Sequence, residues 1–154
     1  MRFSYAKGHK VVASSTATTV AKVSELIVDP VTRSVVAVRL KKSENGDYLR
    51  WNDMVAFGSD AVTVTDDSSL GDGGPEVQAL SGKTHRVLGK RVLTDGGDEL
   101  GKVDDVEFDP ATGTLTSLLV GRGGRHGESS EVAAARLLGV GSYAVVVREQ
   151  AEPL

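Results

Sequence analysis

The stretch KVDDVEFDPATG, residues 102–113, repeats KVSELIVDPVTR, residues 22–33, at a constant offset of 80 residues. Lys, Val, Asp, Pro and Thr recur at identical places in the two stretches. Self-similarity at a fixed period is typical of a chain built from copies of one structural unit. A length of 154 residues accommodates two such units, each with a small core of its own. The repeat therefore predicts two copies of one fold.

Each copy has the signature of a β-hairpin. A short β-compatible run ends at Asp29-Pro30 in the first copy and at Asp109-Pro110 in the second, and a second β-rich run follows. Proline presets φ at the second turn position, the Asp side chain can bond the turn backbone, and Gly113 can adopt a positive φ. Arg33 holds the place of Gly113 in the first copy, which predicts a less ideal turn. Several short strands per copy predict a small barrel or sandwich.

The segment between the copies is acidic and rich in glycine. Residues 66–74 offer too little apolar surface to offset their ordering entropy, which indicates a linker. Pro75, with an acidic residue after it, predicts one short helical turn. We therefore expect a first unit at residues 1–66, a linker at 67–83 and a second unit at 84–150.

The second copy carries a family likeness. Its stretch LGKRV, residues 88–92, followed by LGKVDDVEFDP, residues 100–110, resembles a PRC-barrel domain. This family is named after the photosynthetic reaction centre, whose H subunit has such a domain, and it includes the C-terminal domain of a ribosome maturation factor. The whole chain resembles a tandem of two such barrels, and the first copy departs from the pattern at Ser15 to Thr19, where it lacks the glycine-rich turn.

The resemblance implies an all-β protein of two small, strongly bent barrels in tandem, which could pack as a pseudo-two-fold pair. It also implies an assembly or docking module, and no reaction. The residues expected to build its structural turns are Asp29, Pro30, Gly101, Asp109, Pro110 and Gly113.

The composition argues against most catalytic and cofactor sites. There is no cysteine, which excludes disulfides, thiolate metal sites and a thiol nucleophile. Residues 96–102 have the spacing of a phosphate-binding loop, but Val103 follows where a Ser or Thr must ligate magnesium. The three histidines are far apart in sequence, and the carboxylates of residues 104–109 fit a solvated strand face. We expect no catalytic residue, no cofactor and no metal.

Two segments are candidates for partner binding. Residues 121–127 are predicted to be an Arg-Gly loop whose arginines could make bidentate contacts with phosphate groups. The only tryptophan follows Arg50; it could pack in the core, between the barrels or against a partner. The candidate partner-binding residues are Trp51, Arg50, Arg122, Arg125 and His126.

Charge and hydropathy bound the cellular role. A net charge of −3 and few aromatic residues argue against general nucleic-acid binding. No run is long and apolar enough for a signal peptide or a membrane span, so we expect a cytoplasmic protein. We expect a non-enzymatic adaptor that binds a protein partner of unknown identity, and a tandem pair of barrels could also form a homodimer. The alternatives are a ribosome- or RNA-associated factor and a small-ligand binding protein. The first would be marked by a basic surface around Arg86, Lys90, Arg91, Arg122 and Arg125.

Overall fold

The structure is a computed structural model of the chain that describes residues 1–121 and 129–149. The elements of the first unit are α1 (Phe3–Ala6), β1 (Lys10–Ala13), β2 (Thr18–Asp29), β3 (Ser34–Lys41), β4 (Tyr48–Arg50), η1 (Trp51–Asp53), β5 (Ala56–Phe57) and β6 (Ala61–Val64). The connecting segment holds η2 (Asp67–Ser69), α2 (Gly74–Leu80) and η3 (Lys83–His85). The elements of the second unit are β7 (Arg91–Thr94), β8 (Glu99–Phe108), β9 (Leu115–Gly121), β10 (Ser129–Ala133), η4 (Ala134–Arg136), β11 (Leu137–Val140) and β12 (Val145–Val147).

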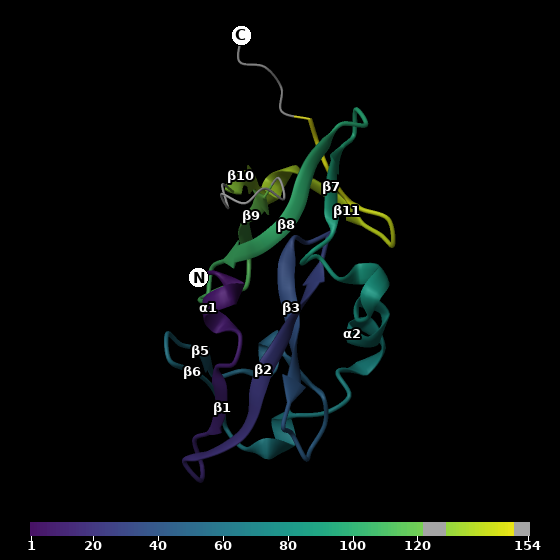
Figure 1. Cartoon of the computed structure of the whole chain (residues 1–154). Coiled ribbons are helices and arrows are strands. Elements are labelled where there is room, and N and C mark those ends of the chain that lie inside the picture. Colours follow the sequence, from purple (N-terminus) through teal and green to yellow (C-terminus); the bar gives the residue numbers. More distant parts are fainter. Residues whose placement is uncertain (122–128, 150–154) are drawn as a thin grey trace.

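The strands form two six-stranded sheets with the same topology (Figure 1). The strand order is β4-β3-β2-β1-β6-β5 in the first sheet and β10-β9-β8-β7-β12-β11 in the second. Each strand of the first sheet occupies the same place as the strand numbered six higher in the second sheet, so that β2 corresponds to β8. In both units the first and last strands pair in parallel, β1 with β6 and β7 with β12. The prediction of an all-β tandem of two barrel-like units is confirmed.

The longest strands of each unit form the predicted hairpin. In the first turn Asp29 Oδ1 accepts a hydrogen bond of 2.8 Å from the Val31 N–H, and in the second Asp109 Oδ1 accepts one of 2.9 Å from the Ala111 N–H. Gly113 has a φ of +81° at the end of its turn, and Arg33 is held at +56° in the equivalent place. Arg33 is thus in a conformation that favours glycine, as its sequence position indicates.

Gly101, expected in a turn, lies within strand β8 instead. It pairs with Val92 of β7 and has a φ of +140°. A side chain there would overlap the carbonyl oxygen of Gly121 on β9. The glycine therefore allows two strands to approach closely.

The connecting segment is packed against the first unit. Leu70 is buried, and Gly71 forms a backbone bridge with Tyr48 at the outer edge of β4. Helix α2 follows, with Pro75 in its first turn as expected, and buries Val77 against the outer face of the first sheet. A few apolar residues in a polar stretch thus hold it in place.

Buried apolar residues of the two units form one continuous cluster. It includes Val23 and Val62 from the first sheet and Val103, Phe108 and Val145 from the second. In Figure 1 the second unit, in green and yellow, lies directly against the hairpin end of the first. Packing links the two repeats into one body.

The turn between β1 and β2 gives a direct test of backbone strain. Ala17 has a φ of +56° there, whereas Gly97 has a φ of +92° in the turn between β7 and β8. Because an L side chain at positive φ costs about 1 kcal/mol, Ala17→Gly should raise the free energy of unfolding by about 0.5–1 kcal/mol in urea titration. The reciprocal change Gly97→Ala should lower it by a similar amount. Equal stability of Ala17→Gly and wild type would contradict the assignment of strain to this turn.

Candidate functional site at the seam between the barrels

The two hairpins meet at a backbone bridge between equivalent residues of the repeat. Ser34 pairs with Thr114 in antiparallel sense, and these positions are 80 residues apart. The Val35 N–H donates to Gly113 O at 2.8 Å, and the Leu115 N–H donates to Arg33 O at 2.9 Å. Each bond is the counterpart of the other with the units exchanged, which is the pattern of a two-fold interface. We call the contact zone around this bridge the seam.

An aromatic cluster fills the seam beside the bridge. The Trp51 ring stacks on Phe57 with centroids 5.7 Å apart, and both rings meet Phe108 of the second unit edge-on. Gly113 lies against the indole, where a Cβ atom would come within 2.9 Å of the Trp51 ring. The sequence left three locations for Trp51: the core, the contact between the barrels, or a partner interface. The structure shows it in contact with the other barrel.

The segment before each barrel crosses the seam to the other barrel. Helix α1 packs on β8, where the Ser4 N–H donates to Asp105 Oδ1 at 3.0 Å and the Ser4 hydroxyl donates to Oδ2. In the opposite direction, Arg86 Nε lies 2.7 Å from Glu25 Oε1 on β2. Glu25 and Asp105 are equivalent residues of the repeat, so each long strand presents one carboxylate to the other unit.

The burial of Asp105 corrects the expectation of a wholly solvated acidic face on this strand. Asp105 is only 8% exposed, although its pairing with Leu119 next to Val106 and Leu118 is regular and places it on the face opposite Val106. Helix α1 packs over that face, and Ser4 hydrogen-bonds the carboxylate. Alternation from Val106 therefore gives the correct face for Asp105, but no sequence signal shows that α1 covers it, so its burial was missed.

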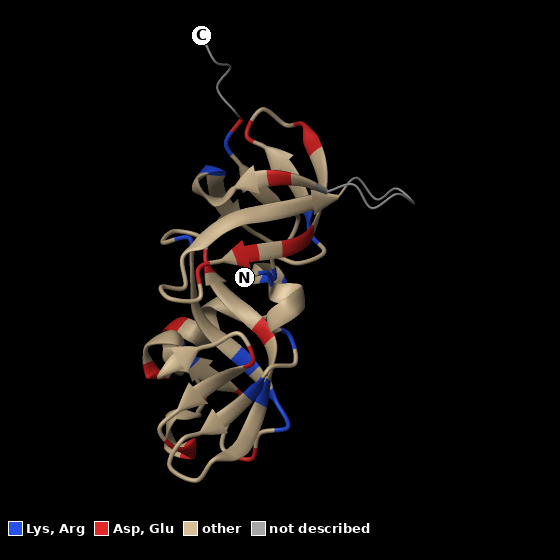
Figure 2. Ribbon diagram, turned by 90° about the vertical axis from the view of Figure 1, so that its left-hand side faces the viewer, with Lys and Arg blue, Asp and Glu red and all other residues tan. Residues whose placement is uncertain are grey.

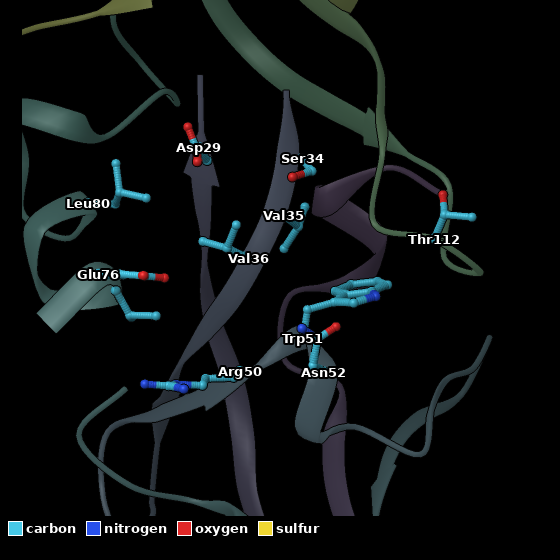
Figure 3. A pocket seen from close by; sticks show the side chains of 11 residues that line it. Asp29, Ser34, Val35, Val36, Arg50, Trp51, Asn52, Glu76, Leu80 and Thr112 are labelled. Carbon is cyan, nitrogen blue, oxygen red and sulfur yellow. The ribbon is translucent and has the colours of Figure 1, made fainter. Parts of the chain in front are cut away.

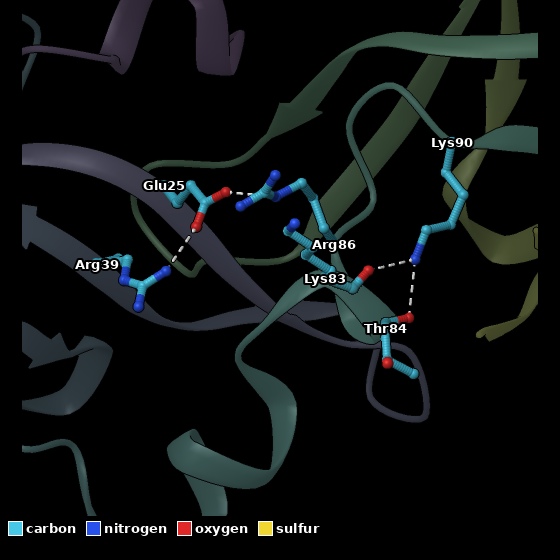
Figure 4. A network of polar contacts seen from close by, with 6 residues as sticks. All are labelled: Glu25, Arg39, Lys83, Thr84, Arg86 and Lys90. Carbon is cyan, nitrogen blue, oxygen red and sulfur yellow. Dashed lines mark hydrogen bonds and ion pairs between the residues drawn. The ribbon is translucent and has the colours of Figure 1, made fainter. Parts of the chain in front are cut away.

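The polar contacts that hold the second unit's opening segment are drawn in Figure 4. Lys90 Nζ donates to the backbone oxygens of Lys83, Thr84 and Gly141 at 2.8–2.9 Å. Partial burial, with the nearby positive charge of Arg86, lowers the pKa of Lys90 below its ordinary value. Lys90 thus ties η3 to the second barrel.

These contacts bear on the basic surface that an RNA-associated factor would need. Arg86 pairs with Glu25, Lys90 binds backbone oxygens, and Arg91 lies 3.4 Å from Glu99 and over the Tyr143 ring. Figure 2 shows positive and negative residues interspersed over both units. These three basic side chains are engaged in the fold.

A groove of about 520 Å³ lies at the seam between β3, η1, α2 and the turn of the second hairpin. Figure 3 shows Leu80 and Glu76 of α2 on one side, Trp51 of η1 on the other, and Val36 of β3 between them. Val36, Trp51 and Leu80 are half-buried, so they offer apolar surface to an occupant. The groove combines an apolar strip with a polar rim.

The ionisable residues on the rim are Asp29, Arg50 and Glu76. Arg50 is fixed by a hydrogen bond of 2.8 Å from its Nε to Gly73 O, and Glu76 is exposed. The rim therefore carries two carboxylates and one guanidinium, a small negative excess.

Only part of the candidate set from the sequence lies at this groove. Arg50 and Trp51 line it, and Asp29 stands at its edge, whereas Arg122, Arg125 and His126 lie outside the described residues. Sequence reasoning missed Val36, Glu76 and Leu80. The helical signal at Pro75 could have indicated α2, but no sequence signal showed which face it covers.

The described residues, 1–121 and 129–149, contain no group of three or more His, Asp or Glu side chains placed to hold a metal ion. Within the same residues, no helix has the length and apolar character to cross a bilayer.

Comparison with protein-family models matches residues 83–145 to the PRC-barrel domain. The match runs from η3 to the first residue of β12, so it covers the second unit up to its last strand. It confirms the family resemblance there, and the first unit repeats the same strand order. A search of curated proteins found no match to the chain.

Proposed function

Because the second unit of the chain is a PRC-barrel domain, repeated in topology by the first, we propose that the protein is a non-enzymatic docking protein. Its binding site is the groove at the seam, and its ligand is a segment of a protein partner. The observation that carries this proposal is the half-buried apolar strip of Val36, Trp51 and Leu80 in a groove that Thr112 of the second unit also lines. Tryptophan is among the residues that most often anchor protein interfaces, and Val36 and Leu80 add apolar surface beside Trp51.

The chemistry of the rim defines the partner segment. An apolar or aromatic side chain would pack against Val36 and Leu80, where it is removed from water. A Lys or Arg next to it would meet the carboxylates of Asp29 and Glu76, because their two negative charges exceed the single positive charge of Arg50. The segment is therefore an apolar anchor with a basic neighbour.

The size of the groove favours one second candidate, a small-ligand binding protein. A volume of about 520 Å³ falls in the range of small-molecule pockets, about 300–1,000 Å³. A thermal-shift screen of metabolites separates the two functions, because a ligand that binds only the folded state raises the melting temperature.

Affinity capture from a nuclease-treated lysate tests the docking function. We expect a protein partner to co-purify in stoichiometric amount with wild type. Leu80→Glu places a charge on the apolar strip beside Glu76 and should weaken capture by about tenfold or more. Leu138→Glu on β11, where the leucine is 43% exposed, is the matched control and should retain the partner.

Circular dichroism establishes that both variants are folded. Undiminished capture by Leu80→Glu would refute the groove as the binding site. Recovery that nuclease abolishes would replace the proposal with an RNA-associated function.

A further inference from the structure

The first barrel shows how its own chain covers an open sheet edge. The Tyr48 N–H donates to Gly71 O at 2.9 Å, and the Gly71 N–H donates to Tyr48 O at 3.0 Å, so residue 71 adds one strand-like pair to β4. Helix α2 then lies over the adjoining face, where Val77 packs with Ile27, Ala37 and Tyr48. The edge and the face beside it are covered by one segment, residues 71–80.

The same edge of the second barrel lacks such a cover among the described residues. Glu131 on β10 pairs with Leu119 as Tyr48 on β4 pairs with Arg39, and Leu119 and Arg39 are equivalent residues. Because alternate residues of an antiparallel strand direct their N–H and C=O groups away from the partner strand, those of Glu131 face outward, as those of Tyr48 do. No described residue pairs with them.

A hollow of about 330 Å³ lies where a counterpart of α2 would sit. The residues that line it are Glu107, Thr116, Ser117, Glu131 and Ala133. Four of these are equivalent, in the same order, to Ile27, Val36, Ala37 and Tyr48 of the first barrel. The covered face is apolar and the open face is polar, so the open face is adapted to water or to a polar occupant.

The side chains at the hollow define the charge of such an occupant. Glu107 and Glu131 contribute two carboxylates, and none of the lining residues is basic. Ser117 donates a hydrogen bond of 3.2 Å to Glu131 Oε1, which holds that carboxylate over the hollow. Arg2 pairs with Glu107 through the backbone, and its exposed side chain forms no ion pair among the described residues.

We propose that the edge of β10 and this acidic hollow form a second docking surface, which binds an extended, basic segment of a partner protein. The segment adds a strand beside β10, as Gly71 does beside β4, and places a Lys or Arg near Glu107 and Glu131. Strand addition gives affinity through main-chain hydrogen bonds, and the side chains of the neighbouring face give selectivity. This surface is separate from the seam groove.

A second copy of the chain is a poor occupant for the same edge. Two β10 strands paired antiparallel about their centre would place Glu131 opposite Glu131. Like charges directly opposite in a sheet are destabilising. The charge of the edge therefore selects a basic partner strand.

Selection of short random peptides displayed on phage against the wild-type chain tests the proposal. We expect enriched peptides to carry Lys or Arg between β-branched residues. In titrations of a synthetic enriched peptide, Glu131→Lys should raise Kd by about tenfold or more, and higher salt should also weaken binding. Asp98→Lys, the same charge reversal at an exposed turn residue, is the matched control and should leave Kd unchanged.

Two further measurements separate strand addition from simple charge attraction. Glu131→Pro removes an outward N–H and no bond to β9, so it should weaken binding while the fold, monitored by circular dichroism, is kept. Glu107→Lys reports on the same surface from β8 if the proline variant fails to fold. Hydrogen exchange should show new protection at the amides of Glu131 and Ala133 when the peptide is bound.

The outcomes also separate this surface from the seam groove. Leu80→Glu should leave the binding of these peptides unchanged. Enrichment of peptides without basic residues, binding unaffected by Glu131→Lys and Glu107→Lys, or self-association through β10 would each overturn the proposal. Loss of binding with Leu80→Glu alone would assign the peptides to the seam groove instead.

Discussion

Phe108→Ala is expected to lower the free energy of unfolding by about 3–5 kcal/mol, the cost typical of truncating a buried phenylalanine. The Phe108 side chain is fully buried and meets Trp51 and Phe57 across the seam at centroid distances of 6.3 and 5.3 Å. Its loss would leave a cavity between the two units as well as within the second. Guanidinium titration followed by circular dichroism measures the change.

The equivalent residue of the first unit provides a matched control. Val28 stands 80 residues before Phe108, is also buried and carries no aromatic ring. Val28→Ala should cost about 2 kcal/mol, because it removes less apolar surface and no ring contact. A double-mutant cycle of Phe108→Leu with Phe57→Leu should give a coupling of about 0.5–1.5 kcal/mol.

The shape of the unfolding curve tests the seam itself. Because the apolar cores form one cluster, wild type should unfold in a single transition. Two transitions in wild type, or a loss below about 1 kcal/mol for Phe108→Ala, would contradict a seam that joins the units through packing.

The repeat and its turns could be predicted because they depend on local chemistry. Asp29 and Asp109 bond the N–H two residues later, and Gly113 takes a positive φ, as the Asp-Pro-x-Thr pattern indicates. Because the repeat has a constant offset of 80 residues, a hairpin predicted in one unit also predicts a hairpin at the equivalent residues of the other. Strand pairing between neighbours along the chain follows from such turns.

The seam could not be predicted, because its contacts join residues far apart in sequence. Ser4 and Asp105 are separated by 101 positions, and neither has a pattern that indicates the other. Residues 67–83 were expected to be a linker with one short helical turn, yet the side chains of Val77 and Leu80, the bridge at Gly71 and the hydrogen bond from Arg50 to Gly73 hold this segment against the first sheet. The average composition of a segment does not reveal individual contacts of this kind.

Gly101→Ala is expected to cost about 3–5 kcal/mol, the combined effect of backbone strain and overpacking. Gly101 has a φ of +140°, and its added Cβ would overlap the backbone oxygen of Gly121 on β9. Because the obstacle is backbone, β8 and β9 must separate locally to admit the methyl group. Urea titration measures the loss, and hydrogen exchange should show weakened protection along β9.

The variant Gly97→Ala distinguishes the effect of backbone strain from that of overpacking. Gly97 also has a positive φ, +92°, but no atom lies within 4 Å of its added Cβ, so only the strain of about 1 kcal/mol applies. Equal losses for the two variants would show that the close approach at Gly101 contributes nothing. Ala21 occupies the place of Gly101 in the first unit, where it is buried and is absent from the residues with positive φ, and Lys41 occupies that of Gly121. The glycine requirement therefore arises from the positive φ of Gly101 together with the close approach of β8 to β9, and it is specific to the second unit.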